Sequence, residues 1–261
     1  MSEYLSFLIE YVSPTALAVA AASVIVAGFL RGFVGFGGAL AMVMILSMVL
    51  GPLAAVPISS LSGVPATLQL LPSVLRDADR RFVLMFGIVS IIAAPFGALV
   101  LVSADPDIMK MAISGFVLVM VVMLYRDWRP AHRFGHMGGA TVSAAVVAGL
   151  IQGAAGVGGP PAVVVALARG GSATTQRANV LGAVTSLNVC AWIPFWYFGL
   201  YTRDVVVISL IVIPLYMLTT WMGARLFSAG GMLHYRNVAL LTLAVIGVGT
   251  FAVAVRGYLV G

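Results

Sequence analysis

Long stretches without a charged residue constrain this fold more than any other feature of the sequence. These apolar stretches cover residues 32–75, 82–104, 137–168, 178–202, 205–224 and 237–255. A helix needs about 20 residues to cross a hydrocarbon core of about 30 Å, so an uncharged stretch of about 18 residues or more predicts a membrane span. Only 8% of the residues are charged and 62% are hydrophobic, whereas soluble domains carry about 25% charged residues. The sequence therefore predicts an all-α polytopic membrane protein.

The charged residues gather in short loops and predict the topology. Because cytoplasmic loops are enriched in Lys and Arg, we expect the turns "SADPD" and "GLYTRD" on the outer side and the arginine-bearing loops on the inner side. The N- and C-termini are then both expected outside. The net charge of +6 follows from this bias, and nucleic acid is not an expected partner. The arginines expected on the inner side are Arg76, Arg80, Arg81, Arg126, Arg129, Arg133, Arg169, Arg177, Arg225 and Arg236.

An internal repeat divides the chain into two similar halves. We expect a first membrane repeat over 12–125, a basic connecting loop over 126–136 and a second membrane repeat over 137–257. Because the predicted topology starts the two halves on opposite sides of the membrane, the repeats are expected to be inverted, which is typical of secondary transporters with a site near the midplane. An offset of 121 residues superposes Gly28, Gly32, Gly35, Gly37 and Gly38 on Gly149, Gly153, Gly156, Gly158 and Gly159.

Both glycine motifs fall in the middle of a hydrophobic stretch. Residues 137–168 would form a helix of about 48 Å, which is longer than one crossing and too short for two straight crossings with a turn. We therefore expect each repeat to begin with two short helices that meet at a glycine break, followed by about three spans. The pair forms either a re-entrant hairpin or two tilted short spans, and charge counting does not separate these two arrangements.

The glycine breaks predict an anion site. Non-helical backbone inside a membrane is tolerated only where it is buried in protein or lines a polar cavity, and the N–H groups at a helix N-terminus attract anions. Helices that begin near 37–38 and 158–159 would both point at one bound anion. The GxxxG pairs Gly28/Gly32 and Gly149/Gly153 are instead expected to pack helices closely. The glycines predicted to line the substrate site are Gly35, Gly37, Gly38, Gly156, Gly158 and Gly159.

Arg31 is the most informative single residue of the sequence. If the first motif is the tip of a hairpin, Arg31 lies deep in the membrane, where a charge is costly and marks a functional site. Its repeat counterpart is Gln152, also a predicted substrate ligand. One arginine opposite one amide would leave a single positive charge, which suits a monovalent anion. Alternatively, Arg31 extends to the cytoplasmic interface from the end of an ordinary span.

Other polar residues near the motifs are weaker candidates for substrate binding. Asn179 and Ser186 lie seven residues apart on one helix face and would line a pathway. Arg177 is more typical of a topology charge, and serines in membrane helices often bond their own backbone. All carboxylates and histidines lie in termini or loops, so we expect no buried carboxylate proton relay and no metal or cofactor. The remaining candidates are Ser59, Ser60, Gln69 and Asn188.

The motifs "GFVGFGG" and "GAAGVGGPP", with "PLAAVPISSL" and "WMGARL", resemble the TauE/SafE family of sulfite and organosulfonate transporters. The resemblance implies a multi-pass carrier in the bacterial inner membrane for sulfite, thiosulfate or an organosulfonate. With the repeat, it favours alternating access; a passive anion channel or a carrier of a non-sulfur organic anion stays open. An enzyme is not expected, because no cluster of nucleophiles, metal ligands or intramembrane carboxylates is present. The glycine faces also permit a homodimer.

Overall fold

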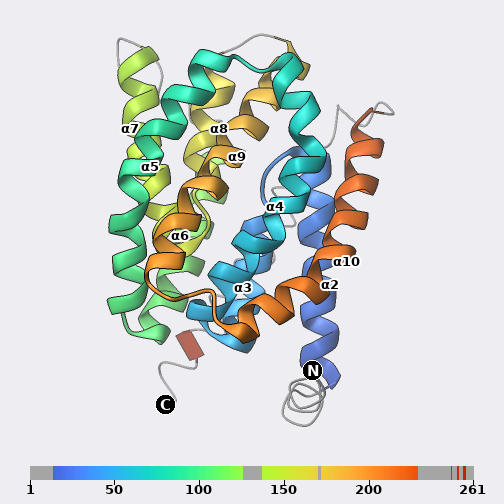
Figure 1. The fold of residues 1–261 in the computed structure, drawn as a ribbon, viewed down its shortest axis with the longest axis vertical. Coiled ribbons are helices and arrows are strands. Elements are labelled where there is room, and N and C mark those ends of the chain that lie inside the picture. Colours follow the sequence, from blue (N-terminus) through green and yellow to red (C-terminus); the bar gives the residue numbers. More distant parts are fainter. Residues whose placement is uncertain are drawn as a thin grey trace.

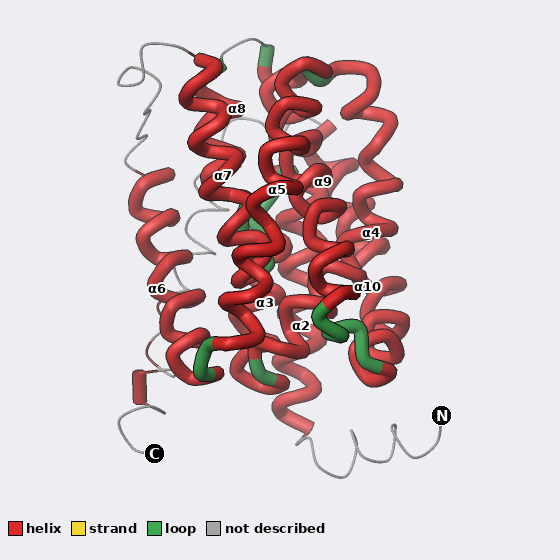
Figure 2. The backbone as a smooth tube through the Cα atoms, turned by 60° about the vertical axis from the view of Figure 1, so that its left-hand side comes forward, coloured by secondary structure: helices red, strands yellow, loops and turns green. Residues whose placement is uncertain are grey.

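The computed structural model describes residues 14–125, 137–169 and 172–228, together with a few isolated positions beyond 228. The described residues form helices joined by short turns, and they include no strand (Figures 1 and 2). The protein is thus an all-α polytopic membrane protein, with helices α4, α5, α7, α9 and α10 long and apolar enough to cross a membrane. The connecting loop over 126–136, both termini and most of the last expected span lie outside the described residues.

The helices follow one another closely along the chain. Their bounds are α2 (Pro14–Val34), α3 (Gly38–Leu50), α4 (Pro52–Asp77), α5 (Arg80–Ser103), α6 (Pro106–Tyr125), α7 (Met137–Ala155), α8 (Gly159–Ala168), α9 (Ala173–Tyr197) and α10 (Arg203–Ser228). Figures 1 and 2 both draw α2 and α3 mainly in the lower part of the bundle and α7 and α8 mainly in the upper part.

Both glycine motifs interrupt a helix, as their position in the sequence predicts. The chain turns between α2 and α3 through Gly35 and Gly37, whose φ angles are +91° and +88°, and between α7 and α8 through Gly156, whose φ is +67°. Glycine adopts such angles without the steric cost that a side chain would bring. After each turn the chain folds back, so that Gly38 lies against Ala27 of α2 and Gly158 lies against Ala148 of α7. The α2–α3 and α7–α8 pairs are therefore helix hairpins.

Two seams of close helix packing flank the centre of the bundle. Helix α2 packs on α10 and helix α7 packs on α5, and these are the two most extensive helix contacts. A Cβ atom added to Gly32 would overlap the carbonyl oxygen of Thr220, and one added to Gly153 would overlap that of Ala94. These contacts confirm the close packing predicted for the GxxxG pairs. They exist because only a bare backbone lets the helices approach this closely.

The seams use equivalent positions in the two halves. A Cβ atom on Gly223 of α10 would meet the carbonyl oxygen of Phe29, and one on Gly97 of α5 would meet that of Leu150. Phe29 and Leu150 are 121 residues apart, which is the offset of the glycine motifs. Each hairpin is thus held against its neighbour by the same arrangement of a glycine and a carbonyl.

Helices α4 and α9 occupy the middle of the bundle and carry much of its polar interior. They are the most buried of the long helices, whereas α5 and α10 bury less than half of their apolar window, as suits a surface that faces lipid. Buried polar side chains of α4 and α9 are Ser59, Ser60, Ser62, Thr67, Asn179 and Asn188. The hairpins direct their breaks at this polar interior, and a shared cavity results.

Candidate functional site

The two helix breaks border one small cavity in the middle of the protein. Its volume is about 20 Å³, which holds about one water molecule. A larger guest therefore enters only if the walls separate. The cavity is lined by Arg31, Phe36, Gly37, Ala39, Leu40, Ser59, Gly63, Gln152, Gly156, Val157, Gly159, Val184, Asn188 and Tyr216.

Equivalent positions from the two halves line this cavity together. Three pairs of lining residues are separated by the repeat offset of 121: Arg31 and Gln152, Phe36 and Val157, and Gly63 and Val184. Each half thus contributes its glycine break and the same stretch of its following long helix, α4 or α9. The site is built from both halves and is incomplete in either one.

Arg31, in the last turn of α2, is the charged residue of the cavity wall. Its side chain is only 3% exposed, so it does not extend to an interface as the alternative interpretation requires. Its Nη2 donates to the hydroxyl of Thr67 at 3.2 Å and its Nη1 to the carbonyl of Gly35 at 3.5 Å. Within the described residues, Nε has no hydrogen-bond partner and no carboxylate pairs with the guanidinium. A buried cation without a counter-ion is costly unless an anion binds beside it.

Gln152 holds the equivalent position in the second break and bonds differently. Both breaks share one backbone bond, because the Gly35 N–H donates to Arg31 O at 3.0 Å and the Gly156 N–H donates to Gln152 O at 2.9 Å. In the second break, Oε1 of Gln152 also accepts from the N–H of Gly158 at 3.1 Å. A guanidinium has no acceptor, so Arg31 leaves the equivalent Gly37 N–H without such a side-chain bond.

Thr67 of α4 links the charged wall to the second half. Its hydroxyl oxygen accepts from Nη2 of Arg31 and, at 3.5 Å, from Nδ2 of Asn188. Thr67 and Asn188 are themselves 121 residues apart. Asn188 was a predicted site residue and Thr67 was missed, although applying the repeat offset to Asn188 finds it. Tyr216 of α10 also lines the cavity. The repeat offset could not have predicted it, because the position 121 residues earlier is Pro95, which has no polar side chain.

The first turn of α3 adds positive potential to the same wall. Gly37 is the N-cap residue of α3 and contributes no side-chain bond to the N–H groups of the first turn. These N–H groups form the positive end of the helix dipole. Together with the guanidinium of Arg31, they make this side of the cavity electropositive, and a helix N-terminus beside a cation is a favourable place for an anion.

The structure brings only part of the predicted site to the cavity. Gly35, Gly38 and Gly158 belong to the hairpin turns but do not line it. The Asn179 Oδ1 accepts from the Asp79 N–H at 2.7 Å, and the Ser186 hydroxyl donates to Gly182 O at 3.0 Å. Predicted residues that line the cavity are Arg31, Gly37, Ser59, Gln152, Gly156, Gly159 and Asn188, and those outside its walls are Gly35, Gly38, Ser60, Gln69, Gly158, Arg177, Asn179 and Ser186.

Arg177 has a role at the end of a helix. Its Nη2 donates to the carbonyl oxygen of Gly32 at 2.8 Å, in the last turn of α2. Cationic side chains stabilise the C-terminal carbonyls of a helix. Arg177 therefore connects the start of α9 to the first hairpin.

An ion pair ties two loops together at one end of the bundle. Asp79, between α4 and α5, pairs with Arg169 at the end of α8 at 2.6 Å. Its carboxylate also accepts from the N–H groups of Phe82 and Arg81. The Phe82 N–H bond, with Arg169, lowers the pKa of Asp79 below its ordinary value. Both loops carry arginines that the charge pattern predicts on one side of the membrane, and the structure places them at one end.

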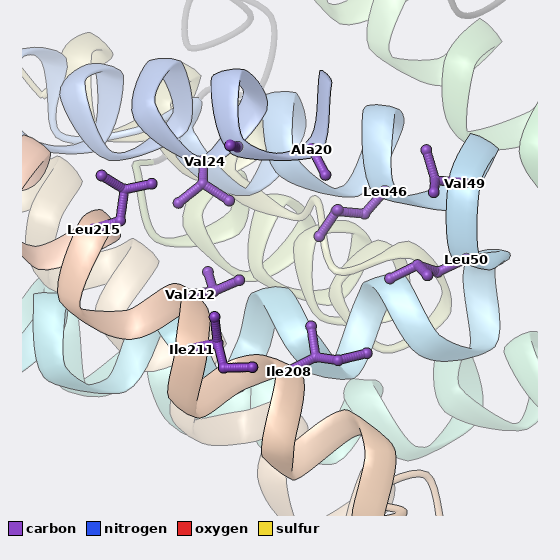
Figure 3. A pocket seen from close by; sticks show the side chains of 10 residues that line it. Ala20, Val24, Leu46, Val49, Leu50, Ile208, Ile211, Val212 and Leu215 are labelled. Carbon is purple, nitrogen blue, oxygen red and sulfur yellow. The ribbon is translucent and has the colours of Figure 1, made fainter. Parts of the chain in front are cut away.

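A second, larger cavity lies between α2, α3 and α10 and has a different character. Its volume is about 190 Å³, and Figure 3 shows Val24, Leu46, Val212 and Leu215 among the side chains that line it. Every lining residue is apolar, so this cavity offers no donor to an anion. The candidate site is therefore the smaller cavity between the breaks.

Comparison with known proteins identifies the family. The model of the family described as sulfite exporter TauE/SafE matches residues 20–250, a range that includes both helix breaks and every residue of the cavity wall. No curated protein and no solved structure matches the chain. The chain therefore belongs to the sulfite exporter TauE/SafE family of membrane transporters.

Proposed function

We propose that this protein is a secondary transporter for a small sulfur-containing anion, such as sulfite, thiosulfate or an organosulfonate, and that it works by alternating access in the bacterial inner membrane. The observation that carries the proposal is Arg31, a buried guanidinium on the wall of a cavity between two helix breaks, without a carboxylate partner among the described residues. The sulfur chemistry of the substrate comes from the family.

The donors of the cavity wall suit an oxyanion. Arg31 supplies a charged fork of N–H groups, α3 supplies the N–H groups of its first turn, and Ser59 and Asn188 supply neutral polar groups. Oxyanions of sulfur offer several acceptor oxygens in a compact tetrahedral or pyramidal shape. Charge-assisted hydrogen bonds from guanidinium to such oxygens are about twice as strong as neutral ones. An anion would replace the bond that Arg31 makes with Thr67.

Alternating access follows from the way the halves meet. We propose that the two halves are inverted repeats, each a hairpin followed by long helices, with both termini on the periplasmic side. Three pairs of lining residues at the repeat offset support this, as does the bond between Thr67 and Asn188. Inverted repeats that rock about a shared central site expose it to each side in turn. The cavity of about 20 Å³ then corresponds to a closed conformation.

Transport by purified protein in liposomes tests the proposal. Arg31→Gln removes the charge and keeps a polar side chain, and we expect it to abolish uptake of sulfite and methanesulfonate without reducing membrane insertion. Arg76→Gln is the matched control, because Arg76 is exposed in a loop and pairs with Asp77, and it is expected to transport normally. Near-normal uptake kinetics in Arg31→Gln would contradict the proposed site.

Counterflow separates a carrier from a channel of the same architecture. Liposomes loaded with unlabelled methanesulfonate should accumulate labelled methanesulfonate transiently if each transport cycle exposes the site to one side at a time. A channel gives no such accumulation. If labelled methanesulfonate does not accumulate and its rate of movement does not saturate with concentration, the protein is a passive anion channel and the carrier proposal is wrong.

A further inference from the structure

We infer that Gln152 sets the charge of the anion that the cavity accepts, so that the substrate carries a single negative charge, as an organosulfonate does. This inference rests on the proposed function and narrows its substrate class. It comes from the difference between two equivalent positions, Arg31 and Gln152, which line one cavity.

The side chain of Gln152 accepts a hydrogen bond from the backbone of its own helix break. Its Oε1 accepts from the Gly158 N–H at 3.1 Å, and because a backbone N–H only donates, this bond fixes the orientation of the carboxamide. The N–H group that would meet an anion in the second break is therefore already bonded to a neutral side chain. The group that Gln152 has left to offer a guest is its NH2, a donor without charge.

The first break has no such acceptor. Arg31 cannot accept a hydrogen bond, and the N-cap residue Gly37 contributes no side-chain bond to the first turn of α3. The guanidinium is 3% exposed, and in the described part of the chain its Nε has no hydrogen-bond partner. Arg31 also lines the cavity. The first break therefore combines an unpartnered buried donor with an uncapped helix N-terminus, and the anion binds on this side.

The charges of the side chains that line the cavity predict which anion charge it accepts. Arg31 is the only ionised side chain among the described residues of the wall, and the other polar members, Ser59, Gln152, Asn188 and Tyr216, are neutral. One negative charge is balanced by one guanidinium. A second negative charge would be buried without a counter-cation, and an unpaired buried charge is strongly unfavourable. Sulfonates bear one charge, whereas sulfate and thiosulfate bear two.

Binding to the purified full-length protein in lipid nanodiscs tests the inference. The probes are methanesulfonate and sulfate at neutral pH, which share a tetrahedral sulfur centre and differ in charge. Wild type is expected to bind methanesulfonate at least about tenfold more tightly than sulfate, which corresponds to about 1.4 kcal/mol. Equal affinities, or a preference for sulfate, would overturn the inference.

Two substitutions of Gln152 test the cause of the preference. Gln152→Glu keeps an acceptor for the Gly158 N–H and adds a negative charge to the cavity that Arg31 lines, so methanesulfonate affinity should fall at least about tenfold. Gln152→Lys adds a second cation, so the affinity for sulfate relative to methanesulfonate should rise at least about tenfold. Gln176→Lys is the control for net charge, because Gln176 lies on α9 away from the cavity wall, and it should keep the wild-type ratio.

The outcomes separate this inference from the proposed function. If wild type binds methanesulfonate, Arg31→Gln loses it and both Gln152 variants keep the wild-type ratio, the proposed site stands and the inference about Gln152 is wrong. If wild type transports neither sulfite nor methanesulfonate in the liposome assay and Arg31→Gln changes nothing, the proposed function fails and the inference fails with it. A change in the affinity ratio, rather than in the melting temperature, distinguishes selectivity from a structural role of Gln152.

Discussion

The two helix breaks share one backbone turn and differ in their side chains. Each ends a helix at a bond from a glycine N–H to the carbonyl of residue 31 or 152 and then folds back through a glycine with positive φ. Yet one break carries a buried guanidinium, and the other carries a carboxamide that bonds its own backbone. Both halves contain the helix hairpin because the fold requires it. The guanidinium charge occurs in one break only, because the site needs a single cation.

The breaks also differ in which of their glycines is crowded. A Cβ atom on Gly38, at the start of α3, would lie 2.6 Å from the carbonyl oxygen of Ala27 and 2.6 Å from the hydroxyl of Tyr216, whereas on Gly159, at the start of α8, its nearest neighbour would be Val184 at 3.9 Å. In the second break the crowded glycine is Gly158, whose added Cβ atom would overlap the carbonyl oxygen of Ala148. Close packing fixes the orientation of the Arg31 side chain relative to the first turn of α3.

The largest expected effect comes from adding one methyl group at these equivalent positions. Gly38→Ala should lower the free energy of unfolding by about 3 kcal/mol, the upper end of the usual overpacking cost, because a backbone carbonyl cannot move aside as a side chain does. Gly159→Ala should change it by less than about 0.5 kcal/mol. Thermal unfolding in one detergent measures both variants. Equal losses would mean that the first residue of α3 and the first residue of α8 are equally crowded.

An intermediate effect is expected at Thr67, where the two halves meet. Thr67→Val keeps the shape of the side chain and removes the oxygen that accepts from Arg31 and Asn188. Leaving buried donors without an acceptor costs about 1–3 kcal/mol, so the melting temperature should fall. Thr67→Ser keeps the oxygen and is the control. If Thr67→Val and Thr67→Ser have the same melting temperature, the Thr67 hydroxyl does not stabilise the position of Arg31.

The smallest effect is expected at the turns that connect the long helices. In the first half, Asp79 caps α5 and pairs with Arg169, whereas in the second half Thr202 caps α10 with its hydroxyl. Asp79→Asn keeps a capping oxygen and loses the ion pair. Because both partners are partly exposed, with side chains 36% and 25% accessible, the loss should be at most about 1 kcal/mol.

The pH dependence of this effect has a definite sign. The pKa of Asp79 is lowered in the fold, chiefly by the Phe82 N–H bond and also by Arg169. Its contribution to stability is therefore fully present above the unfolded value of about 3.9 and is lost as pH falls through the lower folded value. The melting temperatures of wild type and Asp79→Asn should differ at pH 7 and converge below about pH 4. A difference that grows as the pH falls would contradict this sign.

The sequence predicted which segments form the site better than it predicted which atoms their side chains contact. The glycine motifs predicted both breaks, because long apolar segments with glycines in the middle cannot continue as straight helices. The offset of 121 paired Arg31 with Gln152, and the structure places both on the same cavity wall. Asn179 and Ser186, chosen for sharing a helix face, instead bond the Asp79 N–H and the Gly182 carbonyl, since helical spacing does not reveal what a face contacts.

The sequence by itself determined the class of the protein, the positions of its helix breaks and the repeat that relates them, because hydrophobic length, glycine spacing and charge placement act locally along the chain. Only the tertiary structure decided that Thr67 accepts hydrogen bonds from Arg31 and Asn188, that Gln152 occupies the Gly158 N–H, and that Gly38 packs while Gly159 lines the cavity. These are contacts between segments far apart in the chain, and their geometry depends on how the helices pack in three dimensions.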